Sequence, residues 1–365
     1  MKKIFFKISR FVGGLVGLVL LYIAGVLLYG TVNDFQPEGT IALPVEGSAD
    51  QQIISDSILT FTTWNVGYGG LGAEANFFYD SGSMFFSNGK MIRSGEAEVN
   101  KYVAGIEAFA RRDSSDFLLF QEVDYRSKRS YYINQFELVG NVLPGYASVF
   151  AVNYKANWVP LPIFEPWRAY GSTNSGLGSW SKFQPESSDR VQLPGSFAWP
   201  TRIFQLDRCA SVQRFKVSGG KELVVVNVHN SAYDKGGELK AAQMDFLKKL
   251  FLEEYEKGHY VIVGGDWNQC PPGFPFDKFM PGNTSGYTQT NIDQGFLPSD
   301  WTWCFDANTP TNRKVREVYK AGETFVTLID FFLVSPNVQL LKVQTENLNF
   351  LYSDHQPVSM NVKLR

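Results

Sequence analysis

The sequence predicts an α/β (α+β) protein built as a four-layer α/β/β/α sandwich, with two packed β-sheets, helices outside them and one transmembrane helix in front. Three observations predict it: short apolar β-rich runs recur along the chain, helical patterns separate some of them, and a long uncharged stretch lies near the N-terminus. Strands interleaved with few helices favour two layered sheets with helices outside. With 44% hydrophobic and 15% aromatic residues, the chain can bury such a core.

The N-terminus has the pattern of a membrane anchor. Residues 1–10 carry four basic side chains, and residues 11–30 carry no charge and are rich in Leu, Val and Gly. A transmembrane helix needs about 20 apolar residues, so this stretch is long enough to span a bilayer. A cleaved signal peptide is the alternative, but its apolar region is about 7–15 residues long and ends at a small-residue cleavage site. The sequence VLLYGTVND offers no such site, so we expect an uncleaved anchor.

The charges on either side of the anchor predict its direction. Basic residues precede it, whereas Asp34 and Glu38 follow it, and no Lys or Arg occurs until Lys90. The positive-inside rule therefore places residues 1–10 in the cytoplasm and everything after the anchor outside it, in a periplasmic or extracellular location. The protein is then a single-pass membrane protein.

The segment after the anchor is expected to be a linker. Residues 31–55 are polar, contain Pro37 and Pro44 and show no periodicity. Residues 56–365 then form the folded domain.

The β-rich runs of this domain have the length and composition of strands. Several are continuously apolar, as expected for strands that a sheet buries on one or both faces. The expected strands comprise residues 58–66, 116–123, 147–154, 176–183, 211–217, 222–230, 259–267 and 327–335. Helical spacing of apolar residues occurs in residues 98–112 and 238–258, and the second segment ends at Gly258.

Charge and cysteine usage exclude some classes of protein. The chain has 34 Lys and Arg and 36 Asp and Glu, and without the four basic residues of the N-terminal flank it carries a formal charge of 30 − 36 = −6. Nucleic-acid binding gains much of its affinity from basic residues that displace counterions, so this balance disfavours nucleic acid as a partner. The three cysteines, Cys209, Cys270 and Cys304, indicate neither a disulfide framework nor a zinc site.

Polar residues that could carry chemistry fall repeatedly at the ends of the expected strands. Such residues need a reason to be there, because burying them unpaired costs about 1–3 kcal/mol each. Strand ends on one edge of a sheet converge in space, and ligand sites of layered folds are built there. The residues in question are Asn65, Gln121, Glu122, Asn227, His229, Asp266, Asn268, Asp330, Asp354 and His355.

In this order the motifs resemble the endonuclease/exonuclease/phosphatase superfamily, which includes pancreatic-type deoxyribonucleases, inositol-polyphosphate phosphatases and secreted sphingomyelinases. The resemblance covers residues 58–365. The stretches that carry it are TWNVG, LLFQEVD, SGLGSWSK, VVNVHNS, VGGDWNQ, LIDFFLVS and SDHQPV. SGLGSWSK matches less closely, because the superfamily more often has an aliphatic residue where Trp180 stands. The resemblance implies a metal-dependent hydrolase of phosphoesters, most simply a phosphodiesterase.

The resemblance also implies a metal site for Mg²⁺, with Mn²⁺ as a substitute. Glu122 is the expected ligand, Asn65 helps to arrange the metal, and Asp354 lies near it as a direct or water-mediated ligand. Carboxylate oxygens with water and substrate phosphate are the usual ligands of Mg²⁺. Such a cation offsets the charge of the phosphate that would otherwise repel a nucleophile.

The expected catalytic residues have the roles of their family positions. Asp266 orients or deprotonates the attacking water, and Asn268 holds the phosphate. His355 is the expected general base or transition-state donor, and Asp330 pairs with it as the carboxylate does in a catalytic triad. His229 donates to the phosphate or protonates the leaving oxygen.

The substrate is less sharply defined, because one scaffold hosts many functions. We expect Asn227, Asn230 and Arg126 to contact it. An acidic domain behind a membrane anchor, with aromatic residues in the segments 68–86 and 151–200, favours a phospholipid, of the kind that sphingomyelinases cleave. Those aromatic residues could instead fill the core.

Three other functions stay open. An extracytoplasmic nuclease requires a basic groove, for which Arg126, Lys128 and Arg129 are the densest candidates. An inositol-phosphate phosphatase fits less well, because that branch carries a W-x-G-D-x-N-Y-R type motif where this chain reads IVGGDWNQC. The last alternative is a scaffold that binds phosphorylated ligands without turnover.

Overall fold

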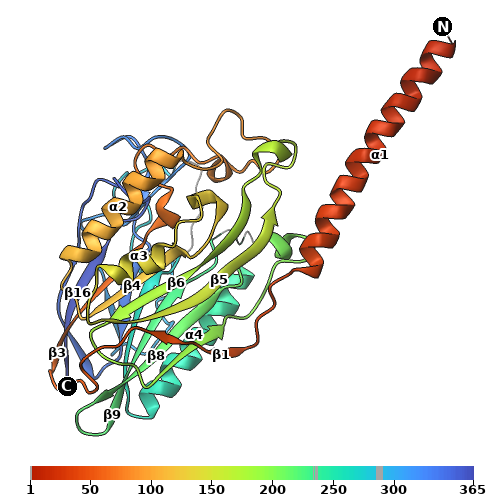
Figure 1. The fold of residues 1–365 in the computed structure, drawn as a ribbon. Helices are drawn as coiled ribbons and strands as arrows, with labels where there is room; N and C mark the ends of the chain where they lie inside the picture. The colour runs from red at the N-terminus through yellow and green to blue at the C-terminus, as the bar shows by residue number, and fades with distance from the viewer. Residues whose placement is uncertain (1, 233, 235–236, 285–290) are drawn as a thin grey trace.

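The computed structural model of the chain describes residues 2–232, 234, 237–284 and 291–365. It contains two seven-stranded sheets of mixed direction that pack face to face, with helices on their outer faces (Figure 1). The predicted α/β/β/α sandwich is therefore confirmed.

The first sheet takes six of its seven strands from the second half of the chain, and β1 from its beginning. Its β9 and β10 are parallel neighbours, and β14 runs antiparallel beside β10. The order across this sheet is β1 (Thr40–Ala42), β7 (Ser187–Gln192), β8 (Cys209–Val217), β9 (Lys221–His229), β10 (Tyr260–Asp266), β14 (Asp330–Val334) and β11 (Thr302–Cys304).

The second sheet joins the two ends of the domain. Its β3 and β4 are parallel neighbours, and β16, the last strand of the chain, pairs antiparallel with β3. The order across this sheet is β15 (Val338–Thr345), β16 (Val358–Leu364), β3 (Ile58–Asn65), β4 (Phe117–Asp124), β6 (Gly171–Ser181), β5 (Ala147–Val159) and β2 (Val45–Glu46).

The alternation of side chains along each strand divides the core into layers. Phe61 of β3 stacks on Phe117 of β4 with ring centroids 4.5 Å apart and meets Phe332 of the opposite sheet edge-on. Side chains on the other face of each strand pack under helices, since successive residues of a strand point to opposite faces. Both parallel strand pairs are thus buried on both sides, which explains their continuously apolar sequences.

The helices cover the two outer faces. The second sheet is covered by α2 (Glu96–Arg112) and α3 (Gln135–Asn141), whose Phe109 and Phe136 pack against aromatic residues of β3, β4 and β6. The first sheet is covered by α4 (Glu238–Glu256), through Leu247 and Phe251. The two longer helices were predicted to within two residues at each end.

The N-terminal helix differs in extent from the prediction. Helix α1 (Lys2–Val32) runs through both the basic flank and the apolar stretch and projects away from the domain (Figure 1). From Lys3 to Val32 it is long and apolar enough to cross a membrane, and its apolar window is not buried in the protein. A helix of this kind near an N-terminus also fits a signal sequence.

The expected linker is partly folded, which corrects the prediction for residues 31–55. Strand β1 pairs with β7 in the first sheet, and β2 pairs with β5 in the second. The folded unit thus begins near Thr40 rather than at residue 56. These strands have three and two residues, too few for any periodicity to reveal them.

The aromatic residues of the segment 151–200 divide between core and surface. Trp180 lies in β6, within the strand expected at residues 176–183, and is only 1% exposed, whereas Trp167 is 77% exposed. Trp180 packs between Phe120 and Phe136, with centroids 5.4 and 5.2 Å away. Core filling and surface exposure therefore both occur here.

Candidate active site

The strand register gathers the predicted residues at one edge of the sandwich. In the first sheet, Asp266 at the end of β10 lies opposite His229 at the end of parallel β9 and opposite Asp330 at the start of antiparallel β14. In the second sheet, Asn65 at the end of β3 lies opposite Gln121 of parallel β4. Because both sheets end at this edge, their polar residues face a common space.

Glu122 reaches this space through an irregularity in β4. The register between β4 and β6 shifts between Phe120 and Val123, and Glu122 has a backbone φ of 55°. A positive φ is uncommon for a residue with a side chain, and residues held this way cluster at functional sites. Since a bulge redirects the side chain of its strand, Glu122 leaves the buried interior and keeps its carboxylate 25% exposed.

Asp266 is the centre of the group. Its Oδ2 accepts a hydrogen bond from Asn65 Nδ2 at 3.0 Å and lies 3.4 Å from His229 Nε2 and 3.8 Å from His355 Nε2. Its Oδ1 accepts from the backbone N–H of Asn268 at 2.9 Å. One carboxylate oxygen is therefore presented to both histidines, while the other is held by the turn after β10.

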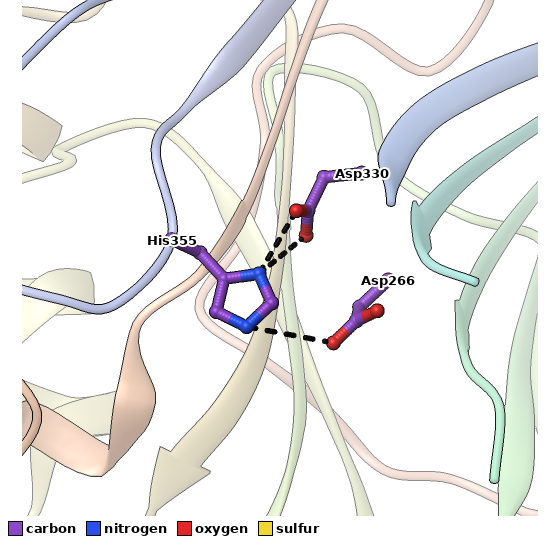
Figure 2. A group of neighbouring side chains, drawn as sticks. All are labelled: Asp266, Asp330 and His355. Atoms are coloured by element: carbon purple, nitrogen blue, oxygen red, sulfur yellow. Dashed lines mark hydrogen bonds and ion pairs between the residues drawn. The ribbon is translucent and has the colours of Figure 1, made fainter. Parts of the chain in front are cut away.

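His355 and Asp330 form a buried pair (Figure 2). The Nδ1 of His355 lies 2.8 and 3.0 Å from the two carboxylate oxygens of Asp330, and Asn312 Nδ2 lies 3.0 Å from its Nε2. The indole N–H of Trp64 donates to the backbone oxygen of His355. The imidazole is thus fixed at both nitrogens, with the Nε2 edge facing Asp266.

The two histidines have opposite shifts in pKa. Burial alone would lower the pKa of His355, but Asp330, Asp354 and Asp266 outweigh it and hold the pKa well above its usual value. Burial lowers the pKa of His229 well below its usual value, and the nearby charge of Arg208 lowers it further. The side of the site that holds Asp330 therefore favours a charged imidazole, and the side that holds Arg208 a neutral one.

Oxygen ligands for a metal ion lie beside this pair. Asn65 Nδ2 donates to Glu122 Oε1 at 3.2 Å, and the Oδ1 of Asn65 is held by the N–H of Gly67. Burial raises the pKa of Asp354 to about 7, and the charge of Glu122 adds to the rise. Two carboxylates that repel each other in a partly buried cavity favour a divalent cation between them, and oxygen is the ligand that Mg²⁺ prefers.

A second group could also hold an ion. Ligand atoms of Asp266, Asp330 and His355 all lie within 4.8 Å of one another. Both oxygens of Asp330 already face His355 Nδ1, whereas Asn65 Nδ2 donates both to Asp266 Oδ2 and to Glu122 Oε1. The oxygens of Asp266 and Asp330 and those of Glu122 and Asp354 are therefore both possible ligands for a metal ion.

The site opens into a cavity of about 190 Å³ with two chemically different parts. Its polar end is lined by Glu122, His229, Asp266, Asn268, Asp354 and His355. Its other end is a chamber of aromatic and aliphatic side chains that includes Tyr68, Phe78, Tyr154, Leu161, Tyr170 and Phe204. Arg129 also lines the cavity, and its guanidinium stacks 3.8 Å from the ring centroid of Tyr68.

The residues predicted to contact the substrate lie elsewhere. Asn227 is buried between the sheets, where it accepts a hydrogen bond from Gln121 and donates to the backbone oxygen of Phe120. Asn230 is fully buried against Met244, and Arg126 is exposed and does not line the cavity. Asn227 and Asn230 thus support the strand ends from behind.

The polar residues of the cavity wall that sequence reasoning missed include Arg208, Asn312 and Arg313. Arg208 directly precedes β8 and donates to the backbone oxygen of His229, so it lies at the strand edge that forms the site. That position was a usable signal, because β8 runs antiparallel to β9 and starts where β9 ends. Asn312 and Arg313 belong to β12 (Asn312–Arg313), which is too short to be recognised.

Comparisons with known proteins agree with this geometry. The sequence pattern described as the Endonuclease/Exonuclease/phosphatase family matches residues 62–355. The fold is similar to that of the endonuclease/exonuclease/phosphatase from Beutenbergia cavernae, at 15% identity and a TM-score of 0.52, over 84% of this chain and 72% of that chain. It is equally similar to the endonuclease/exonuclease/phosphatase from Bacteroides vulgatus, at 15% identity and a TM-score of 0.52, over 85% of this chain and 100% of that chain.

A third solved structure with this fold is ANGEL2, a 2',3'-cyclic phosphatase, at 14% identity and a TM-score of 0.52, over 90% of this chain and 99% of that chain. No curated protein matches the chain in sequence. The family pattern covers most strands of both sheets and every residue of the site from Asn65 to His355. The chain therefore belongs to the endonuclease/exonuclease/phosphatase family.

Proposed function

We propose that the protein is a membrane-anchored, Mg²⁺-dependent phosphodiesterase that hydrolyses a phospholipid, of the kind that sphingomyelinases cleave. Membership of the family supports the hydrolysis of phosphoesters. The observation that carries the substrate class is the two-part cavity, which joins a polar end to an aromatic chamber. A phospholipid has the same division, with a phosphodiester beside an apolar body, whereas a nucleic-acid backbone is polar along its whole length.

The roles of the side chains follow from their positions. Asp266 Oδ2 is the oxygen that orients the attacking water and accepts its proton, because both histidines and Asn65 converge on it. His355, held by Asp330 at Nδ1, directs Nε2 toward Asp266 beside the side-chain amide of Asn312, and Nε2 donates to a phosphoryl oxygen. The bond from the water oxygen to phosphorus forms as the bond to the leaving oxygen breaks, and that oxygen leaves with a proton.

His229 and Asn268 complete the polar end. His229 approaches Asp266 from the first sheet, on the side opposite His355, and is placed to donate to the phosphate or to the leaving oxygen. Asn268 has a backbone φ of 51° and is fixed by its side-chain hydrogen bond to the backbone oxygen of Asn230. Such fixed donors stabilise charge that develops in the transition state without reorganising first.

Glu122 and Asp354 would hold Mg²⁺, with Asn65 orienting Glu122. Both are oxygen donors, both line the polar end of the cavity, and the charge of Glu122 helps to raise the pKa of Asp354. When bound, the cation neutralises charge on the phosphate and stabilises the leaving oxygen.

The anchor places this chemistry at a membrane. Helix α1 has the length and apolar composition of a membrane span, and its basic flank favours a cytoplasmic N-terminus with the domain outside. The C-terminal end of α1 contacts the domain, where Trp199 Nε1 donates to Thr31 Oγ1 at 3.0 Å and Arg202 Nε lies 3.4 Å from Asp34 Oδ2. The domain is thus held close to the surface where its proposed substrate lies.

Two assays on the full chain in detergent or vesicles test the proposal. Hydrolysis of bis-p-nitrophenyl phosphate with Mg²⁺ is expected to be lost in Glu122→Ala and His355→Ala. Wild-type activity in both variants would refute the site, and no hydrolysis by the wild type itself would favour a scaffold. Side-by-side assays on sphingomyelin, phosphatidyl lipids, duplex DNA, RNA and phosphoinositides test the substrate. DNA cleavage without lipid turnover would overturn the preference for lipid.

A further inference from the structure

Three loops form a continuous rim around the aromatic chamber, and we call them the aromatic rim: residues 77–90, 159–170 and 195–206. Each loop turns some side chains inward to the chamber wall, among them Phe78, Leu161 and Phe204. Each also turns large apolar side chains outward to solvent. The exposed members are Met84, Phe85, Phe86, Phe164, Trp167 and Trp199.

The exposed side chains are held together by hydrogen bonds between the first two loops. The backbone N–H of Ile163 donates to Met84 O at 2.9 Å, and that of Phe164 donates to Phe85 O at 3.1 Å. The rings of Phe85 and Phe86 then lie 5.7 and 5.3 Å from that of Phe164. Aromatic residues this exposed, and fixed in one patch, mark an interaction site rather than scattered surface residues.

The third loop connects the rim to α1. Ile203 packs against Gly30, where a Cβ on the glycine would come within 2.9 Å of its Cδ1. Trp199 and Arg202 contact Thr31 and Asp34 at the end of the same helix. Figure 1 shows the loops of residues 77–90 (orange) and 159–170 (yellow-green) at the upper end of the domain. Helix α1 projects from the domain toward the same side, and the C-terminus lies at the opposite end.

The charged groups of the rim are satisfied within the protein. Arg168 pairs with Glu165 at 3.1 Å, and the carboxylate of Glu165 also accepts from the N–H of Ser87. Arg202 pairs with Asp34. Attachment through this surface therefore depends on aromatic contact and little on opposite charge.

We propose that the aromatic rim inserts into the surface of the same bilayer that α1 spans, so that the cavity opens among lipid headgroups. Trp, Tyr and Phe favour the boundary between headgroups and acyl chains, which supports this partner. The inference rests on the proposed function for the lipid substrate and on α1 as an anchor. It explains why one end of the cavity wall continues outward as exposed aromatic side chains.

Site-specific labels on the full chain test the insertion. Cys209, Cys270 and Cys304 are buried, so a cysteine introduced at the surface is the reactive one. We would label Trp167→Cys and Phe85→Cys with an environment-sensitive fluorophore in phosphatidylcholine vesicles whose lipids carry a quencher. The matched control is Ile58→Cys, because Ile58 is 54% exposed and begins β3 at the opposite end from Asn65.

If the rim inserts, a quencher attached to the lipids should quench the fluorescence of the labels at positions 167 and 85 at least about threefold more strongly than that of the control label. Side chains that lie in the headgroup region behave in this way. The difference should persist at high salt and in zwitterionic vesicles. Equal quenching of all three labels by lipid, or equal access of aqueous iodide to all three, would overturn the proposal.

An activity split separates this inference from the proposed function. The double variant Phe85→Ser, Trp167→Ser changes neither the polar end nor the chamber wall, so it should lower turnover of vesicle lipid about tenfold and leave hydrolysis of soluble bis-p-nitrophenyl phosphate unchanged. If the rim labels were quenched but the protein hydrolysed no phosphoester, the insertion would be supported and the proposed function refuted. The insertion alone would be refuted if the protein turned over lipid while the rim labels stayed unquenched. It would also be refuted if the double variant turned over vesicle lipid as fast as the wild type.

Discussion

Asp330→Asn tests the buried histidine pair without changing the shape of the site. The carboxylate of Asp330 is fully buried and faces His355 Nδ1 with both oxygens, at 2.8 and 3.0 Å. Asparagine has the same size, but it removes the negative charge and can present its NH₂ group to the ring. The imidazole then loses both its buried counter-charge and the constraint on its tautomer.

The size of the effect follows from what the pair supplies. Positioned proton donors contribute about 10²–10⁴ in rate, and an Asp-to-Asn change behind a catalytic histidine costs toward the upper end of that range. We expect kcat to fall by about three orders of magnitude, or about 4 kcal/mol in the barrier. Because Asp330 does not touch the substrate in this mechanism, KM should change by less than about threefold.

The assay is steady-state hydrolysis of bis-p-nitrophenyl phosphate over a range of Mg²⁺ concentrations, with Asp300→Asn as the control, since Asp300 is exposed and remote in sequence from the site motifs. A kcat within tenfold of the wild type would refute the role of the pair. A variant whose main defect is a higher Mg²⁺ requirement would instead identify Asp266, Asp330 and His355 as the metal site.

Three further changes test the metal site, the pH dependence of stability and the core. Mg²⁺ at 100 times its Kd should stabilise the wild type by about 2.7 kcal/mol and so raise its Tm, and it should not raise the Tm of Glu122→Gln. If Mg²⁺ raised the Tm of Glu122→Gln as much as that of the control Glu256→Gln, the assignment would be contradicted. Burial, and secondly the charge of Asp34, raise the pKa of Asp207 to about 7, whereas its pKa in the unfolded chain is about 3.9. The stability that Asp207 contributes is therefore fully present below about pH 4 and is lost as the pH rises through about 7. Asp207→Asn should therefore raise Tm relative to the wild type at pH 8 but not at pH 4, and a difference independent of pH would count against this. Trp180→Ala should lower the free energy of unfolding by about 3–5 kcal/mol in denaturant titrations, and Trp167→Ala by less than about 0.5 kcal/mol; equal losses would mean that the two side chains are not core and surface.

The elements that could be predicted are those with a strong local pattern. Strands β3, β4, β9 and β10 are buried on both faces, so their sequences are continuously apolar, and a polar residue at their ends stands out. Helices α2 and α4 carry apolar residues at helical spacing. The site could be inferred for the same reason, because the family motifs are these strand ends.

Most of the elements that were missed have weak local patterns. Strand β15, at the edge of the second sheet, is buried only at its two ends, so no apolar run marks it. Strand β16 beside it does alternate between buried and more exposed residues, and this pattern was a usable signal. Strands β1 and β2 are recognised only by their distant partners β7 and β5. Asn312 joins the site by bridging to His355, a tertiary contact that leaves no local pattern.

Identical residue types also had different fates that local sequence does not decide. Trp180 and Trp167 lie in one aromatic-rich segment, yet the first is enclosed by Phe120 and Phe136, and the second is solvent-exposed. What separates them is the pairing of β6 with β4 and β5, which buries Trp180 under α3. Burial of this kind depends on which strands meet, and that information is spread over the whole chain.

The fate of the basic residues after Glu122 bears most directly on the choice between lipid and nucleic acid. Arg129 is buried in an ion pair with Asp124 at 2.8 Å, and Lys128 Nζ lies 5.3 Å from the ring centroid of Trp158, so only Arg126 of the three is freely exposed. A nuclease that contacts several phosphates loses affinity steeply as salt rises. Since the exposed members of the aromatic rim are uncharged side chains, activity on vesicle lipid should instead change little between low and high salt. The salt dependence of turnover therefore distinguishes the two substrate classes through a property of the protein surface alone.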